Sequence, residues 1–330
     1  MKRITKIILW TLGILLLALF CFFFVGSPQP AEDMKWGVNF SKKHSQDLGL
    51  DWKENYNALL EDLEADHLKI VAYWDWVEPQ KDEYNFENLD WQVKRANEEN
   101  AKLLLVMGQR VPRWPECHFP GWVEDLSKQE REKELLELIE KITKRYEDEP
   151  SIWAWQVENE PFFPFGECPD PDESFLREEV NLVKEIDSQH PIVVTESGEF
   201  PLWIKAARFG DIVGTTLYRE VWFEEMSMYF KYPFPPVFYQ RKAKLIDWLF
   251  DKKVINVEMQ TEPWGPKLMY DISLEEQKKT MNLEQFKKNI NYARRTGLDT
   301  FYLWGSEWWY WLKVEHDQPQ IWNEAKKLFK

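Results

Sequence analysis

Eight short apolar runs alternate along the chain with segments of helical periodicity, and this alternation limits the fold more than any other feature. In the clearest helical segment, 129–147, Leu135, Leu138 and Ile142 fall on one face, with polar residues opposite. Alternating strands and helices are typical of a parallel sheet, and eight pairs predict an α/β protein with a closed (β/α)8 TIM barrel. The runs lie at 36–40, 68–73, 102–107, 152–157, 191–195, 211–217, 254–257 and 300–304.

An open, doubly wound sheet is the rival fold. Neither G-x-G-x-x-G nor a P-loop follows the first apolar run, which disfavours nucleotide-binding folds of that type. The composition does not change between residues 34 and 330, so we expect one barrel domain there. Its other helices should begin near residues 52, 89, 173, 202, 237, 274 and 322.

The first 26 residues predict a membrane anchor. Residues 7–25 carry no charge and follow three basic residues, and 19 helical residues span about 28 Å, close to the hydrocarbon thickness of a bilayer. A cleaved secretory signal and, given Cys21, a lipoprotein signal are the alternatives. Basic residues remain on the cytoplasmic side, so residues 27–33 should be a linker and residues 34–330 should lie outside the cytoplasm.

Cysteine and histidine usage agrees with that location. Outside the apolar segment the chain has Cys117 and Cys168, for which we expect a disulfide in an oxidising compartment. The chain has five histidines and no H-E-x-x-H motif, so we do not expect a metal site.

Charge and aromatic content indicate the class of ligand. The formal net charge is −15, whereas nucleic-acid binding requires a basic surface. The 19 tryptophans are an unusually high number, and the faces of sugar rings stack on exposed aromatic side chains. We therefore expect a carbohydrate ligand and predict neither nucleic-acid binding nor a required protein partner.

Glutamates follow two of the apolar runs. Asn159 and Glu160 follow the fourth run, and Glu258 ends the seventh, with Glu262 four residues further on. A barrel gathers the carboxyl ends of its strands at one mouth, and glycoside hydrolysis requires two carboxyl groups that face each other. Glu158 directly precedes Asn159 and should point away from the mouth.

With Asn-Glu-Pro after the fourth run and a glutamate ending the seventh, residues 34–330 resemble glycoside hydrolase clan A, the retaining β-glycosidases built on (β/α)8 barrels. The cellulase-like family 5 is the nearest family. The resemblance implies that Glu160 is the acid/base and that Asn159 binds the sugar 2-hydroxyl. It also implies that Glu258 is the nucleophile, that Tyr218 hydrogen-bonds it, and that Trp304 forms the floor of the cleavage subsite.

The chain departs from this pattern at two places. Many clan members carry arginine on strand two, where this chain has Lys69, and histidine near the end of strand three, where it has Gln109 and Arg110. We expect Arg110 and Glu262 to bind substrate, although Arg110 equally suits a salt bridge and Glu262 is a second candidate nucleophile. Several tryptophans of the predicted rim should line a cleft, Trp74 among them: Trp74, Trp76, Trp114, Trp122, Trp264, Trp308, Trp309 and Trp311.

The resulting hypothesis is a membrane-anchored retaining β-glycoside hydrolase that needs no cofactor. Burial and the charge of Glu258 should keep Glu160 protonated near neutral pH. A retaining route places the two carboxyl groups about 5–5.5 Å apart. A transglycosylase with the same carboxylates, or a non-catalytic carbohydrate-binding barrel, is the alternative.

Overall fold

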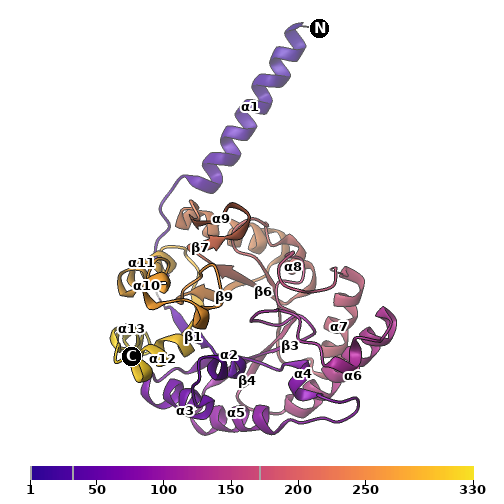
Figure 1. The fold of residues 1–330 in the computed structure, drawn as a ribbon. Coiled ribbons are helices and arrows are strands. Elements are labelled where there is room, and N and C mark those ends of the chain that lie inside the picture. The colour runs from indigo at the N-terminus through magenta and orange to yellow at the C-terminus, as the bar shows by residue number, and fades with distance from the viewer. Residues whose placement is uncertain (1, 32, 171) are drawn as a thin grey trace.

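The computed structural model describes residues 2–31, 33–170 and 172–330 and consists of a barrel domain and a projecting N-terminal helix (Figure 1). Residue 1 of the predicted anchor and residue 32 of the predicted linker lie outside the described residues. The projecting helix, α1 (Lys2–Phe24), stands on one flank of the barrel. Its segment Arg3–Phe24 is long and apolar enough to cross a membrane.

Eight parallel strands close into a barrel in the order β1-β10-β9-β6-β5-β4-β3-β2, which confirms the predicted fold. The strand bounds agree with the predicted runs to within two residues, except that β9 continues three residues beyond the predicted end. Glu258 therefore lies inside a strand rather than after one. The strands are β1 (Lys35–Asn39), β2 (His67–Val71), β3 (Lys102–Met107), β4 (Ile152–Val157), β5 (Ile192–Glu196), β6 (Ile212–Leu217), β9 (Val254–Gln260) and β10 (Thr300–Trp304).

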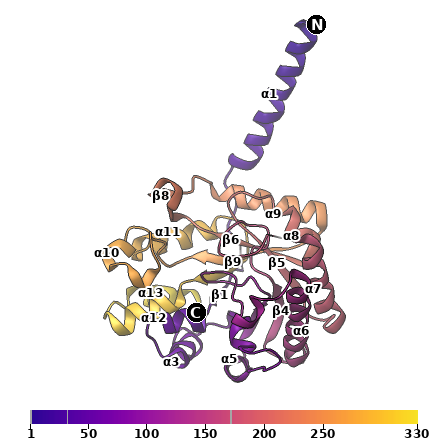
Figure 2. The ribbon, with the colours of Figure 1, turned by 45° about the vertical axis from the view of Figure 1, so that its right-hand side comes forward.

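Helices surround the barrel (Figures 1 and 2). Local signals fix their starts: Ser127 and Glu130 form a capping box on α6, and the Asp172 side chain caps α7. The helices are α2 (Lys42–Asp47), α3 (Trp52–Asn57), α4 (Trp74–Val77), α5 (Glu87–Glu98), α6 (Lys128–Tyr146), α7 (Glu173–Ile186), α8 (Ile204–Phe209), α9 (Pro236–Phe250), α10 (Leu274–Gln277), α11 (Leu283–Arg294), α12 (Ser306–Glu315) and α13 (Gln320–Ala325). Short helical turns lie at Ala58–Asp62, Gly121–Val123, Glu224–Met226, Met269–Asp271 and Lys326–Leu328.

Two parts of the fold differ from the sequence-based expectation. The helix expected from residue 274 is divided into α10 and α11, because the Asn282 side chain caps a new helix start. An antiparallel hairpin, β7 (Glu220–Phe223) and β8 (Met228–Lys231), follows β6. Each of its strands has only four residues and carries two adjacent aromatic side chains, which is too short a pattern for periodicity to separate it from a loop.

The core has two layers. The larger layer lies between the strands and the surrounding helices and includes fully buried Trp155 and Trp309. The smaller layer fills the barrel interior, where the Trp153 indole N–H donates to the Tyr302 hydroxyl at 2.9 Å. Trp153 lies on β4 and Tyr302 on β10, on opposite sides of the closed sheet, so this hydrogen bond crosses the barrel beneath its mouth.

We predict that Tyr302→Phe lowers the free energy of unfolding by about 1 kcal/mol, because the Trp153 N–H then loses its acceptor. Urea unfolding measures the change. Tyr270→Phe on the surface is the matched control and should change stability by less than about 0.5 kcal/mol. Equal stability of the two variants would contradict this role of the hydrogen bond.

Candidate active site

A bulge in β9 directs Glu258 into the barrel mouth. Ile255 and Val257 already face the barrel interior, and the pairing with β6 skips Val257, so that Glu258 pairs with Thr216. Such a bulge re-aims the following side chain. Glu258 is buried, and it is bound from two sides: Lys69 Nζ donates to Oε1 at 2.8 Å and the Tyr218 hydroxyl donates to Oε2 at 3.1 Å.

Glu160 is partly exposed at the end of β4 and is held in an uncommon backbone conformation. Its φ angle is 45° and that of Glu158 is 59°, a region that side chains other than glycine adopt at a cost. The Glu160 N–H donates to Thr195 Oγ1 at 2.7 Å, and Thr216 Oγ1 donates to Glu160 Oε1 at 3.1 Å. Thr195 on β5 thus fixes the backbone of Glu160, and Thr216 on β6 fixes its carboxyl group.

The surroundings of Glu160 favour its protonated form. Burial raises the pKa of Glu160 well above its usual value, and the negative charges of Glu258, Glu199 and Glu116 raise it further, against the hydrogen bond from Thr216. The Tyr218 hydroxyl also has a pKa well above its usual value because of burial and the charge of Glu258, so it remains a donor. The mouth therefore contains one carboxyl group whose surroundings favour the protonated form and one that is paired with a cation.

Asn159 lies in the mouth beside a third carboxyl group. Gln156 Nε2 donates to Asn159 Oδ1 at 3.0 Å, which leaves the Asn159 amide group to donate to Glu116 Oε2 at 3.4 Å. Burial and the charge of Glu258 raise the pKa of Glu116 to about 8. Glu116 was not predicted to be a site residue.

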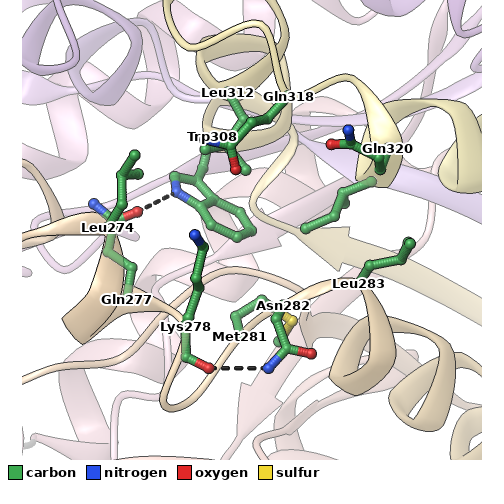
Figure 3. A pocket seen from close by; sticks show the side chains of 11 residues that line it. Leu274, Gln277, Lys278, Met281, Asn282, Leu283, Trp308, Leu312, Gln318 and Gln320 are labelled. Carbon is green, nitrogen blue, oxygen red and sulfur yellow. Dashed lines mark hydrogen bonds between the residues drawn. The ribbon is translucent and has the colours of Figure 1, made fainter.

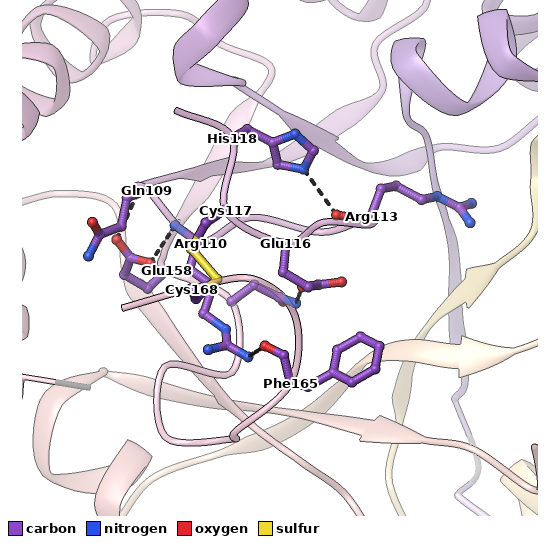
Figure 4. The surroundings of a disulfide bond; sticks show 10 residues. Gln109, Arg110, Arg113, Glu116, Cys117, His118, Glu158, Phe165 and Cys168 are labelled. Atoms are coloured by element: carbon purple, nitrogen blue, oxygen red, sulfur yellow. Dashed lines mark hydrogen bonds between the residues drawn. A yellow bond between two sulfur atoms is a disulfide. The ribbon is translucent and has the colours of Figure 1, made fainter. Parts of the chain in front are cut away.

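The loop that carries Glu116 packs tightly against the loop after β4. Gly166 has a φ of +80°, and a Cβ there would lie 2.6 Å from the Glu116 Cβ, so glycine is required for this approach. The Glu167 N–H donates to Pro115 O at 2.9 Å. Cys117 and Cys168 form the predicted disulfide between the same two loops (Figure 4).

Arg110 supports these loops. It is buried, and its guanidinium donates to the Phe165 carbonyl oxygen. The backbone N–H of Arg110 donates to Glu158 Oε2 at 2.8 Å (Figure 4). Glu158 also accepts from the Gln109 N–H at 2.9 Å, so Glu158 is turned away from the mouth, as expected. Arg110 makes loop contacts in this structure, and its predicted substrate contact stays a prediction.

Trp304 lies at the end of β10, and an ion cluster supports it. The Arg113 guanidinium stacks 4.0 Å from the Trp304 ring centre and binds Glu262 through two hydrogen bonds, of 2.5 and 3.1 Å. Arg113 also contacts Glu307, which is fully buried, at 3.4 Å. Both carboxylate oxygens of Glu262 bind Arg113, so Glu262 holds in place the guanidinium that stacks on Trp304.

Of the tryptophans assigned to the rim, the structure places Trp114 and Trp264 beside the site. Trp264 meets the Tyr218 ring edge-on at 5.1 Å and the Phe165 ring at 5.8 Å, and half-exposed Trp114 meets Phe165 at 5.9 Å. These rings form a row that extends from Tyr218, which hydrogen-bonds Glu258, to the solvent. Trp74, Trp308 and Trp309 are buried instead.

Trp74 thus differs from the predicted substrate contact. Its ring has no exposed surface, its N–H donates to Glu78 Oε2 at 2.9 Å, and it packs edge-on against Trp122. The reason is that Trp74 begins the short helix α4, which turns the chain back over the barrel wall.

A separate cavity of about 200 Å³ lies between α10, α11, α12 and α13 (Figure 3), and its lining includes none of Glu160, Glu258 and Glu116. Its wall is mostly apolar and includes Met281, Trp308 and Leu312. Among the described residues, no group of three or more His, Cys, Asp or Glu side chains is arranged to hold a metal ion.

Lys69 and Glu116 are among the site residues to which sequence reasoning gave no role, as is Arg113, which stacks on Trp304. The signal for Lys69 was a single cation within the apolar run at 68–73, where burial requires a partner. Glu116 stands next to Cys117, and the disulfide places its loop over the mouth. That placement depends on a contact between distant segments, which local sequence does not specify.

Comparison with known proteins gives one family match. The model of Glycosyl hydrolase family 10 matches residues 64–178, about a third of the chain, and this segment contains Lys69, Glu116 and Glu160. None of the curated protein sequences matches the chain significantly.

Solved structures share the fold at low sequence identity. A β-galactosidase from the Antarctic haloarchaeon Halorubrum lacusprofundi has a TM-score of 0.55 and 15% identity over 82% of this chain and 52% of its own. A GH5_18 protein from Streptomyces cattleya in complex with GlcNAc has a TM-score of 0.57 and 14% identity over 84% of this chain and 71% of its own. The exo-β-1,4-mannosidase Op5Man5 from Opitutaceae bacterium strain TAV5 has a TM-score of 0.56 and 13% identity over 84% of this chain and 53% of its own.

This chain therefore spans about half the length of two of these three proteins. The family match and the shared fold support a (β/α)8 glycosidase of the clan A type. They do not single out family 5, which the sequence indicated as the nearest family, because the matching model is that of family 10.

We predict that breaking the disulfide, in Cys117→Ser/Cys168→Ser, lowers the free energy of unfolding by about 2–4 kcal/mol, since the bond closes a long loop. Thermal unfolding with and without reductant measures the loss. Reductant should lower the melting temperature of the Cys21→Ser control but not that of the double variant. An unchanged melting temperature in the double variant would contradict the prediction.

Proposed function

We propose that the protein is a retaining β-glycoside hydrolase in which Glu258 is the nucleophile and Glu160 the acid/base. The observation that carries this proposal is the different environment of the two groups. Glu258 touches the Lys69 ammonium and the Tyr218 hydroxyl, whereas Glu160 lies among negative charges that keep a proton on it. Two carboxyl groups with opposite protonation states at one barrel mouth suit double displacement.

In the first step Glu258 attacks the anomeric carbon while Glu160 gives its proton to the leaving oxygen, which produces a glycosyl ester and a free alcohol. Esterification removes the charge of Glu258 and with it part of what raises the pKa of Glu160. Glu160 is then a better base and takes a proton from the water that hydrolyses the ester. Each group returns to its starting form.

The neighbouring side chains suit defined roles. Asn159, oriented by Gln156, would donate to the sugar 2-hydroxyl in place of Glu116. The Trp304 ring, supported by Arg113, would form the floor beneath the reacting sugar. Trp264 and Trp114 would carry the sugar units that extend outward, because aromatic faces stack on sugar rings.

The substrate class we propose is a β-linked oligosaccharide or polysaccharide outside the cytoplasm. A helix able to span a membrane, with basic residues before it, supports a single-pass anchor with the barrel on the far side. The disulfide between Cys117 and Cys168 agrees with an oxidising compartment.

The test of the nucleophile is trapping with 2-deoxy-2-fluoro-β-glycosyl fluorides of glucose, galactose, mannose and xylose. The fluorine slows hydrolysis of the glycosyl ester more than its formation, so we expect one fluorosugar residue per protein by intact mass, with fluoride released. Peptide mapping should place it on Glu258. Glu262→Gln is the matched control and should still be labelled, whereas Glu258→Gln should not.

A label on Glu262 would keep the mechanism and overturn the assignment of the nucleophile. No label from any sugar, together with no hydrolysis of aryl β-glycosides, would contradict a glycosidase and favour the non-catalytic alternative. Sugar transfer to an added acceptor in excess of hydrolysis would instead identify a transglycosylase.

The raised pKa of Glu160 predicts the pH profile. Glu160 must be protonated in the first step, so kcat/KM should fall as the pH rises through that raised pKa. Glu116 gains its negative charge near pH 8 and opposes ionisation of Glu160. Glu116→Gln removes this charge, lowers the pKa of Glu160, and should move the basic limb to lower pH.

The pH dependence of kcat/KM for an aryl β-glycoside measures this shift. Glu262→Gln is the control, because Glu262 is not among the groups that raise the pKa of Glu160. Glu160→Gln should lower kcat/KM about 10²–10⁴-fold with a natural leaving group and remove the basic limb. A basic limb that is unchanged in Glu116→Gln would contradict the electrostatic coupling.

A further inference from the structure

The last turn of α1 packs against α9. The Phe24 ring lies 5.4 Å from that of Phe238 and 6.4 Å from that of Phe234, and Phe23 lies 5.9 Å from Phe238. The Arg241 guanidinium lies 5.1 Å from the Phe22 ring centre. The helix is therefore seated on the barrel, and Figure 2 shows α9 running across its end.

This seating fixes the depth of α9 if α1 spans a bilayer. The 22 residues of Arg3–Phe24 rise about 33 Å, which is close to the roughly 30 Å of the hydrocarbon layer. The span is therefore only about as long as the hydrocarbon layer is thick, and Phe22, Phe23 and Phe24 lie at the edge of that layer. The side chains of α9 that touch them lie at the level of the lipid headgroups.

The face of α9 that touches α1 continues beyond the contact as an exposed surface. Lys244, Leu245 and Trp248 follow Arg241 at helical spacings of three, four and seven residues, so they share its face. Trp248 is 80% exposed, which is rare for so large a ring in a soluble domain. Tryptophan next to lysine or arginine is the typical composition of a membrane interface.

A second exposed group lies on the other side of the contact. Phe200 is 67% exposed, and its ring lies 6.0 Å from Phe234 and 6.0 Å from Tyr232. Phe234 is the residue that meets Phe24, so the exposed surface is continuous with the seat of α1. We name Phe200, Phe234, Arg241, Lys244 and Trp248 the α9 flank.

We propose that the α9 flank rests on the headgroup region of the bilayer that α1 spans, so that the barrel lies on its side on the membrane. The proposal rests on the membrane anchor included in the proposed function, and not on the glycosidase chemistry. Arg241 and Lys244 bring positive charge to this face of an acidic chain, which suits the anionic surface of lipid membranes.

The orientation has a consequence for access to the carboxyl groups. The helices of a barrel run along its axis, so a barrel that lies on α9 opens its mouth sideways along the membrane. The Arg219 guanidinium, next to Tyr218, donates to the Phe234 carbonyl oxygen at 3.2 Å. One wall of the candidate active site therefore stands directly on the α9 flank, and β-linked sugars close to the membrane surface lie level with the mouth.

The test uses the full chain, with its disulfide intact, in vesicles of phosphatidylcholine and phosphatidylglycerol. An environment-sensitive fluorophore is attached to single cysteines: native Cys21, or Cys21→Ser combined with Trp248→Cys, Phe200→Cys or Lys94→Cys. Lys94, exposed on α5 at the opposite side of the barrel, is the matched control. Spin-labelled lipids report depth, and iodide reports exposure to water.

We expect probes at 248 and 200 to shift their emission to shorter wavelength and to be quenched by lipids labelled at the headgroup. The probe at 94 should be quenched by iodide, and the probe at 21 by lipids labelled in the upper part of the acyl chains, because Cys21 directly precedes Phe22 at the edge of the hydrocarbon. If the probe at 248 is as accessible to iodide as the probe at 94 while Cys21 lies in the acyl region, the proposed orientation of the barrel is wrong. The membrane anchor would still stand. A Cys21 probe without lipid quenching would overturn the anchor and this inference with it, but not the glycosidase chemistry.

Discussion

The ion pair between Lys69 and Glu258 is the interaction on which the rest of the barrel mouth depends. Both groups are buried, and a buried carboxylate without a partner would cost several kcal/mol. Lys69 reaches Glu258 from β2, and Tyr218 reaches it from the end of β6, the neighbour of β9, so side chains from three strands meet at one carboxylate. Burial and, after it, the negative charge held there raise the pKa of Glu160 and Glu116.

Glu160 and Glu116 respond to that charge in different ways. Glu160 is held by Thr216 and surrounded by acidic groups, whereas Glu116 lies near Arg110 and Asn159, both of which lower its pKa. Both shifts favour the protonated form, in which a carboxyl group can donate a hydrogen bond. The arrangement lets one ionised carboxylate remain buried without gathering three negative charges in the same small volume.

Sequence reasoning identified the barrel and the residues that stand at its strand ends, because hydrophobic periodicity is local and strand ends in a barrel share one mouth. In this way Asn159, Glu160, Tyr218 and Glu258 were predicted to stand at the mouth, and the structure brings them together there, while their roles stay predictions. Trp74 was misplaced since the burial of a side chain after a strand depends on how the chain folds back there. The bulge that turns Glu258 inward is likewise a property of pairing between strands, which residue spacing does not encode.

The segment from Tyr218 to Phe238 joins the chemistry of the mouth to the position of the barrel. Tyr218 holds Glu258, the Tyr232 N–H donates to the Arg219 carbonyl oxygen at 3.0 Å, and the Phe234 and Phe238 rings stack 4.5 Å apart beneath α1. The barrel cannot rotate about α1 without separating these rings from Phe24 and losing their buried apolar contact. The same packed segment therefore positions the nucleophile candidate and fixes the direction in which the mouth opens.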